Sequence, residues 1–407
     1  MTVNPSKVNY DPFSHEAMKD PYPLYKAMRA EGKPHFIEKY NAWAFCRFQD
    51  VWDASLNQEE NITFTAGQTP GQVLLGEMIP RTFMTMDAPE HRKWRGLIRE
   101  AYTPEGAMKE APRIRKMVRE ILHPLLAKGE MDVYKDFANR VTTINGGYNL
   151  GLPSEDAEKW RALIDDMLWR DQGQKGGGSE RNNKAAGELF GYLAAKVAEL
   201  RAHPDAAVRH AAAYLHADID GKKLNDEELT YYLFSLLVVG SETTPFTVAG
   251  TLYHLAKNPA QKKEVLANLD LLKKAFLETA RYEQPTNMLA RKAKRDFEVN
   301  GAKIKAGQGL LYIYASAERD ENEYENADVY DFHRQPTKRS LMFGHGGHKC
   351  LGMHVGVLLG LTILEELLKA IGDYELVEEK CERAYGEHLS GWLKLVIRWN
   401  PATAKLA

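Results

Sequence analysis

One cysteine on a glycine-rich loop carries the most specific chemistry in this chain. Residues 343–352 read Phe-Gly-His-Gly-Gly-His-Lys-Cys-Leu-Gly, and Cys350 stands directly before an apolar, helix-like stretch at 353–368. A thiolate is a strong iron ligand, and the free N–H groups and dipole at a helix start stabilise its negative charge. The glycines around the cysteine allow the backbone to approach a flat cofactor closely. The loop therefore favours iron ligation by Cys350.

Two other interpretations of this loop remain open at this point. A lone cysteine in an intracellular protein is often buried and inert, and glycines alone are typical of an ordinary loop. A zinc site is the sharper rival, because three histidines crowd around the cysteine, namely His345, His348 and His354. However, structural zinc sites normally pair two separated ligand clusters, and the sequence contains no second Cys/His cluster.

A second segment could hold water and move protons. Residues 230–255 read as one long helix that contains Glu242, Thr243 and Pro245. Proline lacks an N–H and clashes with the carbonyl four residues earlier, at Ser241, so we expect the helix to open locally there. An acid and a hydroxyl beside such an opening can bind water. A proline-kinked helix with solvated hydroxyls is an equally good interpretation of this segment alone.

Two charge patterns are less specific. Glu278 and Arg281 stand at i,i+3 on one helical face, where a surface salt bridge of little energetic value is the ordinary interpretation. His91 and Arg95 stand at i,i+4 on one face of another expected helix. Taken singly, charged residues of this kind are more often solvated than functional.

Together these motifs resemble the cytochrome P450 family. The loop is similar to the family's haem-binding sequence, Phe-Gly-x-Gly-x-His-x-Cys-x-Gly, at each fixed position. The long helix resembles the family's Ala/Gly-Gly-x-Asp/Glu-Thr motif at Gly240, Glu242 and Thr243. The resemblance runs from about residue 91 to residue 352. It implies the cytochrome P450 fold, mainly α with small peripheral β-sheets, and haem b (iron protoporphyrin IX) as cofactor.

The resemblance also implies roles for individual residues. Cys350 would be the axial iron ligand, whose electron donation favours O–O cleavage. Thr243 would hydrogen-bond dioxygen bound at the haem, and Glu242 would relay protons from solvent. The remaining haem contacts implied by the family motifs are His91, Arg95, Arg291, Phe343, His348 and Gly352. A structural ion network under the haem loop would consist of Glu278, Arg281 and Arg334.

Substrate contacts follow from the resemblance with less detail. The candidates are Leu236, Val239, Leu289 and Trp392, within wider pocket segments at 63–85, 287–289 and 389–393. Val239 replaces the small residue usual in the family, so its branched side chain should narrow the space over the haem and favour a compact ring compound. The apolar and aromatic lining fits terpenoids, steroids and alkyl- or methoxy-aromatics equally well. After Gly352 the sequence departs from the common bacterial Leu-Ala-Arg-x-Glu, which bears on the subfamily.

Apolar periodicity near 3.6 residues predicts the elements that position these residues. Helices are expected at 113–126, 155–169, 185–201, 226–256, 271–281 and 353–370. Extended segments are expected at 42–48, 297–304, 309–314 and 393–399, with a hairpin turn at 299–302. The glycine-rich stretch 171–183 predicts a mobile connection between two helices. Because no long linker interrupts the pattern, we expect a single domain over 1–407.

Composition narrows the class of protein. The chain has 407 residues, 44% of them hydrophobic, and a formal net charge of −2, which gives no bulk electrostatic case for nucleic acid or an anionic membrane. Three well-separated cysteines suit a reducing cytoplasm. The first twenty residues contain no apolar core, so neither a signal peptide nor a membrane anchor is expected there.

The resemblance implies a haem-thiolate monooxygenase, similar to cytoplasmic bacterial cytochromes P450. It would insert one atom of O2 into a small apolar substrate by hydroxylation or oxidative dealkylation. No fused flavin or iron–sulfur segment is expected, so a separate ferredoxin and ferredoxin reductase would supply electrons to a monomer, and Lys349 could contact an acidic partner. The alternatives are a peroxide-driven haem enzyme and a non-catalytic haem carrier or gas sensor.

Overall fold

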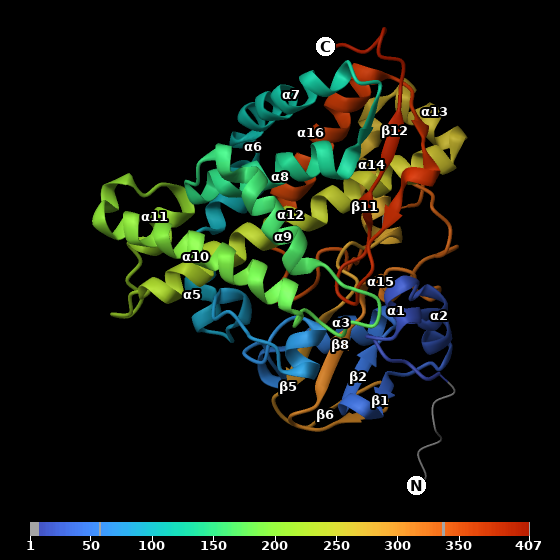
Figure 1. Cartoon of the computed structure of the whole chain (residues 1–407). Coiled ribbons are helices and arrows are strands. Elements are labelled where there is room, and N and C mark those ends of the chain that lie inside the picture. Colours follow the sequence, from blue (N-terminus) through green and yellow to red (C-terminus); the bar gives the residue numbers. More distant parts are fainter. Residues whose placement is uncertain (1–7, 57, 336–337, 407) are drawn as a thin grey trace.

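The computed structural model describes residues 8–56, 58–335 and 338–406, and it confirms the mainly helical prediction. Figure 1 shows most of the helices gathered in the upper part of the molecule, with the largest sheet below them. The α-helices are α1 (His15–Lys19), α2 (Tyr22–Ala30), α3 (Phe48–Leu56), α4 (Gln58–Asn61), α5 (Glu90–Gly96), α6 (Pro104–Lys109), α7 (Ala111–Leu126), α8 (Asn139–Leu150), α9 (Ala157–Leu168), α10 (Glu180–Ala202), α11 (Arg209–Leu215), α12 (Asp226–Lys257), α13 (Pro259–Ala267), α14 (Leu272–Tyr282), α15 (Tyr314–Ala317) and α16 (Met353–Ile371).

The strands are short and form small sheets. They are β1 (His35–Ile37), β2 (Ala42–Phe45), β3 (Ile62–Thr63), β4 (Glu130–Asp132), β5 (Leu289–Ala293), β6 (Phe297–Val299), β7 (Ala302–Ile304), β8 (Gly309–Tyr312), β9 (Glu375–Leu376), β10 (Glu382–Arg383), β11 (Trp392–Lys394) and β12 (Val396–Arg398). The largest sheet has the strand order β1-β2-β8-β5-β3. The predicted hairpin is present between β6 and β7, with Asn300 and Gly301 in the left-handed region that such a turn requires.

All six predicted helices are present, with small differences at their ends. The predicted loop at 171–183 is shorter than expected, because α10 already begins at Glu180. Ser179 caps that helix by accepting a hydrogen bond from the backbone N–H of Asn182, whose side chain reaches back to the cap residue. The pair Ser179 and Asn182 therefore marks the helix start, although the glycines of this stretch suggested an irregular loop.

The extended segment expected at 393–399 is two strands in two different sheets. β11 pairs with β10, whereas β12 pairs with β4 and β9. Leu395 lies between the two strands and is buried. Its N–H donates to the Asp132 carboxylate (3.1 Å), and its carbonyl accepts from the Val133 N–H (2.8 Å), so the chain crosses from one sheet to the other with its backbone groups satisfied.

The long helix α12 runs through the core of the protein. Asn225 caps it by accepting from the backbone N–H of Glu228, and most of its residues from Leu229 onward are buried. By length and composition α12 could cross a membrane, but 67% of its apolar window is buried inside the protein, as in a core helix. At about 1.5 Å per residue, its 32 residues span about 48 Å.

Pro245 affects α12 differently from the prediction. The helix continues through the proline without interruption. The carbonyl of Ser241, which has no N–H to accept from at position 245, accepts instead from the Thr142 hydroxyl of α8 (3.0 Å). The missing helical hydrogen bond is therefore replaced by one from a neighbouring helix, which keeps the buried carbonyl satisfied without a break in the helix.

Candidate functional site

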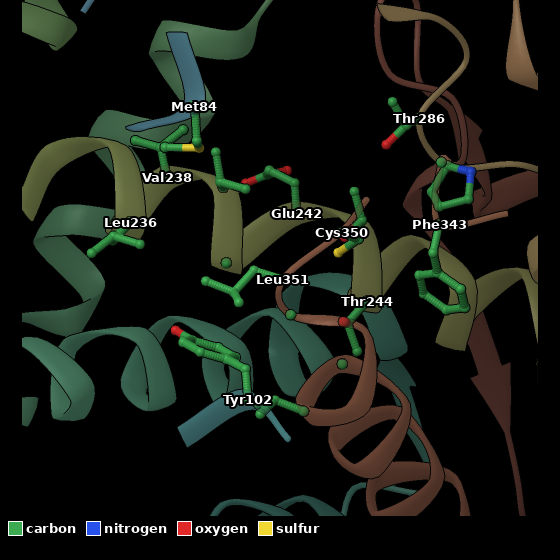
Figure 2. A pocket seen from close by; sticks show the side chains of 18 of the residues that line it. Met84, Tyr102, Leu236, Val238, Glu242, Thr244, Thr286, Phe343, Cys350 and Leu351 are labelled. Atoms are coloured by element: carbon green, nitrogen blue, oxygen red, sulfur yellow. The ribbon is translucent and has the colours of Figure 1, made fainter. Parts of the chain in front are cut away.

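A cavity of about 370 Å³ lies between α12 and the loop that precedes α16. Figure 2 shows Cys350, Leu351 and Phe343 from that loop and Glu242 and Thr244 from α12 around this one space. Both segments that the sequence singled out for their chemistry therefore border the same cavity, although about a hundred residues separate them in the chain.

Hydrogen bonding and two special glycines shape the cysteine loop. The backbone N–H of Cys350 donates to the carbonyl of Phe343 (2.8 Å), which closes the loop on itself. Gly344 and Gly346 have φ values of +69° and +80°, a conformation that favours glycine. A side chain at Gly346 would also collide with the amide of Gln58 and lie 3.0 Å from the carbonyl of Ser55. The loop thus needs glycine at these positions for its backbone shape and its packing.

The Cys350 thiol faces the cavity. Its side chain is exposed, but to this internal space, since Cys350 is one of the residues that line it. Burial raises the pKa of the Cys350 thiol, while the backbone N–H groups of Gly352 and Met353 and the charges of Arg95 and Lys349 act to lower that pKa. These N–H groups at the start of α16 are donors for a thiolate, and a bound metal cation would deprotonate the thiol outright.

Two arginines and a histidine, whose pKa is lowered by burial so that its ring is neutral, gather on one side of the cavity. Arg95, Arg291 and His348 line it, and Arg291 is buried without an ion-pair partner among the described residues. Burial lowers the pKa of the Arg291 guanidinium. His91 does not itself line the cavity but stacks on His348, with ring centroids 3.8 Å apart, and its Nε2 is buried with no hydrogen-bond partner in the described part of the chain. An anionic group would satisfy these donors.

The α12 acid is anchored by a buried network. Glu242 forms an ion pair with Arg161 of α9 (2.5 Å) and accepts a hydrogen bond from the Tyr134 hydroxyl (3.0 Å). Arg161 also pairs with Asp165 (2.5 Å), whose side chain is 42% exposed, and donates to Asn139 (2.8 Å). The network therefore connects a carboxylate at the cavity with a carboxylate that solvent reaches.

Three of the four predicted substrate contacts line the cavity: Leu236, Val239 and Leu289. Val239 is 58% exposed, and because it lines the cavity, this exposure faces the internal space. β5 brings Leu289 and Arg291 to the cavity together, because residues two apart on a strand point to the same face. Thr243 lines the cavity beside Glu242.

The structure places Trp392 elsewhere. It does not line the cavity; its ring packs on Tyr253, with centroids 4.2 Å apart, and lies beneath the guanidinium of Arg383. The preceding turn contributes Leu389 and His388 to the cavity wall instead. The prediction was wrong for Trp392 because β11 begins at this residue and carries its ring into the core.

Glu278, Arg281 and Arg334 form ion pairs, as the family pattern implied. Arg281 makes two hydrogen bonds with the Glu278 carboxylate (2.7 and 2.8 Å), and Arg334 lies 3.6 Å from the same carboxylate. Arg281 also donates to the carbonyls of Glu318 and Ala327. Because both members of the first pair are buried, this is not the surface salt bridge that the spacing alone suggested.

We expect Arg281→Met to destabilise the fold by about 3–5 kcal/mol, because it leaves the Glu278 carboxylate buried and weakly paired. Urea unfolding followed by circular dichroism would measure the loss. Arg334→Met is the matched control and should cost clearly less, since its longer contact leaves the bidentate pair intact. Equal losses for the two variants would contradict the dominant role of Arg281.

The loop between α9 and α10 is fastened to two distant segments. The backbone N–H of Gly177 donates to Glu77 (2.6 Å), and Arg170 lies 3.4 Å from the buried carboxylate of Glu387. The Glu77 carboxylate also sits so close to Gly176 that a side chain there would collide with it. The glycines of this loop therefore leave room for the Glu77 carboxylate to pack against the backbone, a role that the sequence did not indicate.

Comparison with known proteins agrees with this geometry. The family model "Cytochrome P450" matches residues 176–370. Cytochrome P450 109 of Bacillus spizizenii is 28% identical over 93% of this chain and 91% of its own length, and cytochrome P450 130 of Mycobacterium tuberculosis is 26% identical over 94% and 96%. The solved structure of CYP109Q5 from Chondromyces apiculatus superposes with a TM-score of 0.83 at 26% identity, covering 98% of this chain and all of that one. The chain belongs to the cytochrome P450 family.

Membership makes this cytochrome P450 a haem-containing oxidoreductase of the monooxygenase class. The residues present fit a haem group. Gly240 lines the cavity with no atom within 4 Å of where a side chain would begin. Among the described residues, Arg291 has no ion-pair partner and Nε2 of His91 has no hydrogen-bond partner, and propionates would supply both. The described part of the chain holds no group of three or more His, Cys, Asp or Glu side chains arranged for a metal ion.

Sequence reasoning missed the residues that hold Glu242 in place. Tyr134 is 108 positions away from Glu242, and neither it nor Arg161 stands in a recognisable motif. Arg161 lies on the apolar face of a predicted helix, and the structure shows that it is buried. Because a buried arginine needs an acidic partner, its position on that face was the one signal in the sequence that pointed to such a pair.

Proposed function

We propose that this cytochrome P450 oxidises a compact apolar ring compound, by hydroxylation or oxidative dealkylation, with electrons from a separate ferredoxin and its reductase. The observation that carries the proposal is the pair Glu242 and Thr243 at the cavity, with the acid held in place by Arg161 and Tyr134. An enzyme that activates dioxygen needs protons delivered to a water-poor site, whereas a haem carrier has no use for an anchored acid and a hydroxyl there.

The chain's own residues would divide the work as follows. The Cys350 sulfur binds the haem iron, and the N–H groups at the start of α16 stabilise its negative charge. Phe343 and Gly352 line the cavity beside Cys350 and would contact the haem, while His91, Arg95, Arg291 and His348 would bind the propionates. When bound, haem supplies the iron that activates dioxygen for transfer of one oxygen atom.

The distal residues would manage protons and position the substrate. The Thr243 hydroxyl would donate a hydrogen bond towards dioxygen, and Glu242 would take protons from water and pass them on. Tyr134 and Arg161 are positioning residues, because they touch Glu242 rather than the reacting atoms. Leu236, Val239 and Leu289 exclude water and fix the ring compound over the haem.

Electrons would enter on the side of the cysteine loop. Lys349 and Arg99 are exposed there. Arg95 connects α5 to the cysteine loop by donating a hydrogen bond to the Lys349 carbonyl (2.5 Å). Exposed basic groups suit an acidic ferredoxin, since opposite charges speed the encounter. We further propose one domain over residues 1–407, a monomer, and a cytoplasmic location.

The proposal is tested by product formation under 18O2 with NADH, a ferredoxin and its reductase, using a panel of alicyclic and aromatic ring compounds. Incorporation of one labelled atom that depends on NADH supports it. Product formation with hydrogen peroxide at the same or a higher rate, without dependence on the ferredoxin, would identify a peroxide-driven enzyme. No oxygenated product with any compound, despite haem binding, would favour a carrier or sensor.

Substitution of Val239 by alanine should widen the ligand range. The valine methyl groups face the cavity, so their removal opens space beside the ligand. We expect the dissociation constant of the bulkier panel members, measured by spin-state titration, to fall about tenfold. Val208→Ala, on an exposed residue that does not line the cavity, is the control. An unchanged ligand range would refute the idea that Val239 limits substrate size.

A further inference from the structure

A histidine forms part of the cavity wall in the turn between β10 and β11. His388 lines the cavity together with Thr286, Leu289 and Leu389. The turn is held firmly: the His388 carbonyl accepts from the Asn287 N–H (2.9 Å), and the Asn287 side chain donates to the Glu387 carbonyl (2.8 Å). The imidazole therefore has a fixed position beside mainly apolar neighbours.

Its hydrogen bonding defines which ring nitrogen faces a ligand as an acceptor. Nδ1 of His388 lies 2.9 Å from the carbonyl oxygen of Met288. A carbonyl oxygen only accepts, so Nδ1 carries the proton, and in the neutral ring Nε2 is left with a lone pair. Burial lowers the pKa of His388, and the charges of Arg170 and Arg291 act in the same direction, against Glu387 and the Met288 carbonyl, so the neutral ring is favoured.

No described residue supplies a donor to that lone pair. Among the residues that the structure describes, the Met288 carbonyl is the hydrogen-bond partner of the His388 ring. Two other polar groups of the wall are already engaged: the Thr247 hydroxyl donates to the Thr243 carbonyl (3.0 Å), and Glu242 is held by Tyr134 and Arg161. Nε2 of His388 is not among the buried polar atoms that lack a partner, so in a cavity-lining residue it is accessible to a ligand, and a ligand that brings a donor can pair with it.

We propose that His388 selects hydroxylated ring compounds, by accepting at Nε2 a hydrogen bond from an alcohol or phenol group of the substrate. This inference rests on the proposed function, and it defines the substrate class more closely. An ether or ketone of the same skeleton brings only lone pairs to Nε2 and leaves the acceptor unsatisfied. Sites built to bind a hydroxyl reject analogues without one strongly, because the protein group is then left unpaired.

The test compares trans-4-propylcyclohexanol with its methyl ether and with 4-propylcyclohexanone, by spin-state titration of the ferric holoenzyme. The wild-type protein should bind the alcohol at least about tenfold more tightly than either analogue. In His388→Phe this preference should fall to near one, and in His388→Gln it should largely return, because the glutamine side-chain oxygen also accepts. Equal affinities for the three compounds in the wild type, or no response to any of them, would overturn the inference.

A second readout separates this role from contact with the cofactor. Haem content and reduction potential should be the same in the wild type, His388→Phe and His388→Gln. Loss of haem or a shifted potential in both variants would mean that the ring serves the cofactor and would overturn substrate selection. The carbon monoxide spectrum of the reduced wild type tests the proposed function separately, since thiolate-bound haem can be present whether or not alcohols are preferred.

Discussion

Cys350→Ser will abolish oxygenation and remove the strongly red-shifted Soret band of the reduced carbon monoxide complex. The Cys350 sulfur faces the cavity, and backbone N–H groups at the start of α16 point towards it. A serine hydroxyl at this position is a far weaker electron donor than a thiolate, so haem would bind without the electronic push that favours O–O cleavage. Visible spectroscopy of the reduced protein under carbon monoxide, followed by the NADH-dependent assay, measures both effects.

The two other cysteines provide matched controls. Cys46 is buried with its sulfur 3.9 Å from that of Met28, and Cys381 accepts from the Val396 N–H (3.4 Å), both away from the cavity lining. Cys381→Ser should keep the red-shifted band and the activity, and Cys46→Ser should lower stability without changing the band. A red-shifted band that survives in Cys350→Ser would assign the axial ligand to another residue.

The fold could be predicted from the sequence wherever a local signal was strong. Helix α12 combines an Asn225 cap, an acidic first turn and a long apolar stretch, and its bounds matched the prediction within one residue. The Asn300-Gly301 turn fixed the β6–β7 hairpin by backbone conformation alone. The segment around Leu395 misled the prediction, because its change of sheet depends on Asp132, a residue far away in the chain.

Residues of the site, like the elements of the fold, could be predicted where the local sequence carries a strong signal. Motif residues such as Cys350 and Glu242 were found because their spacing is characteristic, and the structure places both at one cavity. The groups that hold them were not found, because Arg161 and Tyr134 act through tertiary contacts that leave no pattern in the sequence. Trp392 is a residue that the sequence wrongly assigned to the cavity. Its side chain points into the core, because the alternation of side chains along a strand, and not their composition, decides which face each one occupies.

Glu242→Gln will lower NADH-dependent turnover by about 10²–10⁴-fold, the range typical of a lost acid–base group. Glutamine has nearly the same shape and can still accept from the Tyr134 hydroxyl, but it cannot carry a proton. Substrate binding and the carbon monoxide spectrum should be unchanged, because neither depends on the charge at this position. The solvent isotope effect on NADH oxidation should rise, since proton delivery then limits the rate.

The ion pairs of Arg161 make this prediction separable from a structural effect. In Glu242→Gln, Arg161 keeps Asp165 and Asn139 as partners, so the cost in stability should stay below the 3–5 kcal/mol or so expected when a buried charge loses its only partner. Asp165→Asn is the control, because it removes the other carboxylate of Arg161 and leaves the acid at the cavity in place. If Glu242 delivers the protons, Asp165→Asn slows turnover far less than Glu242→Gln. Equal and small effects of the two substitutions would mean that protons reach the haem by a route that bypasses Glu242.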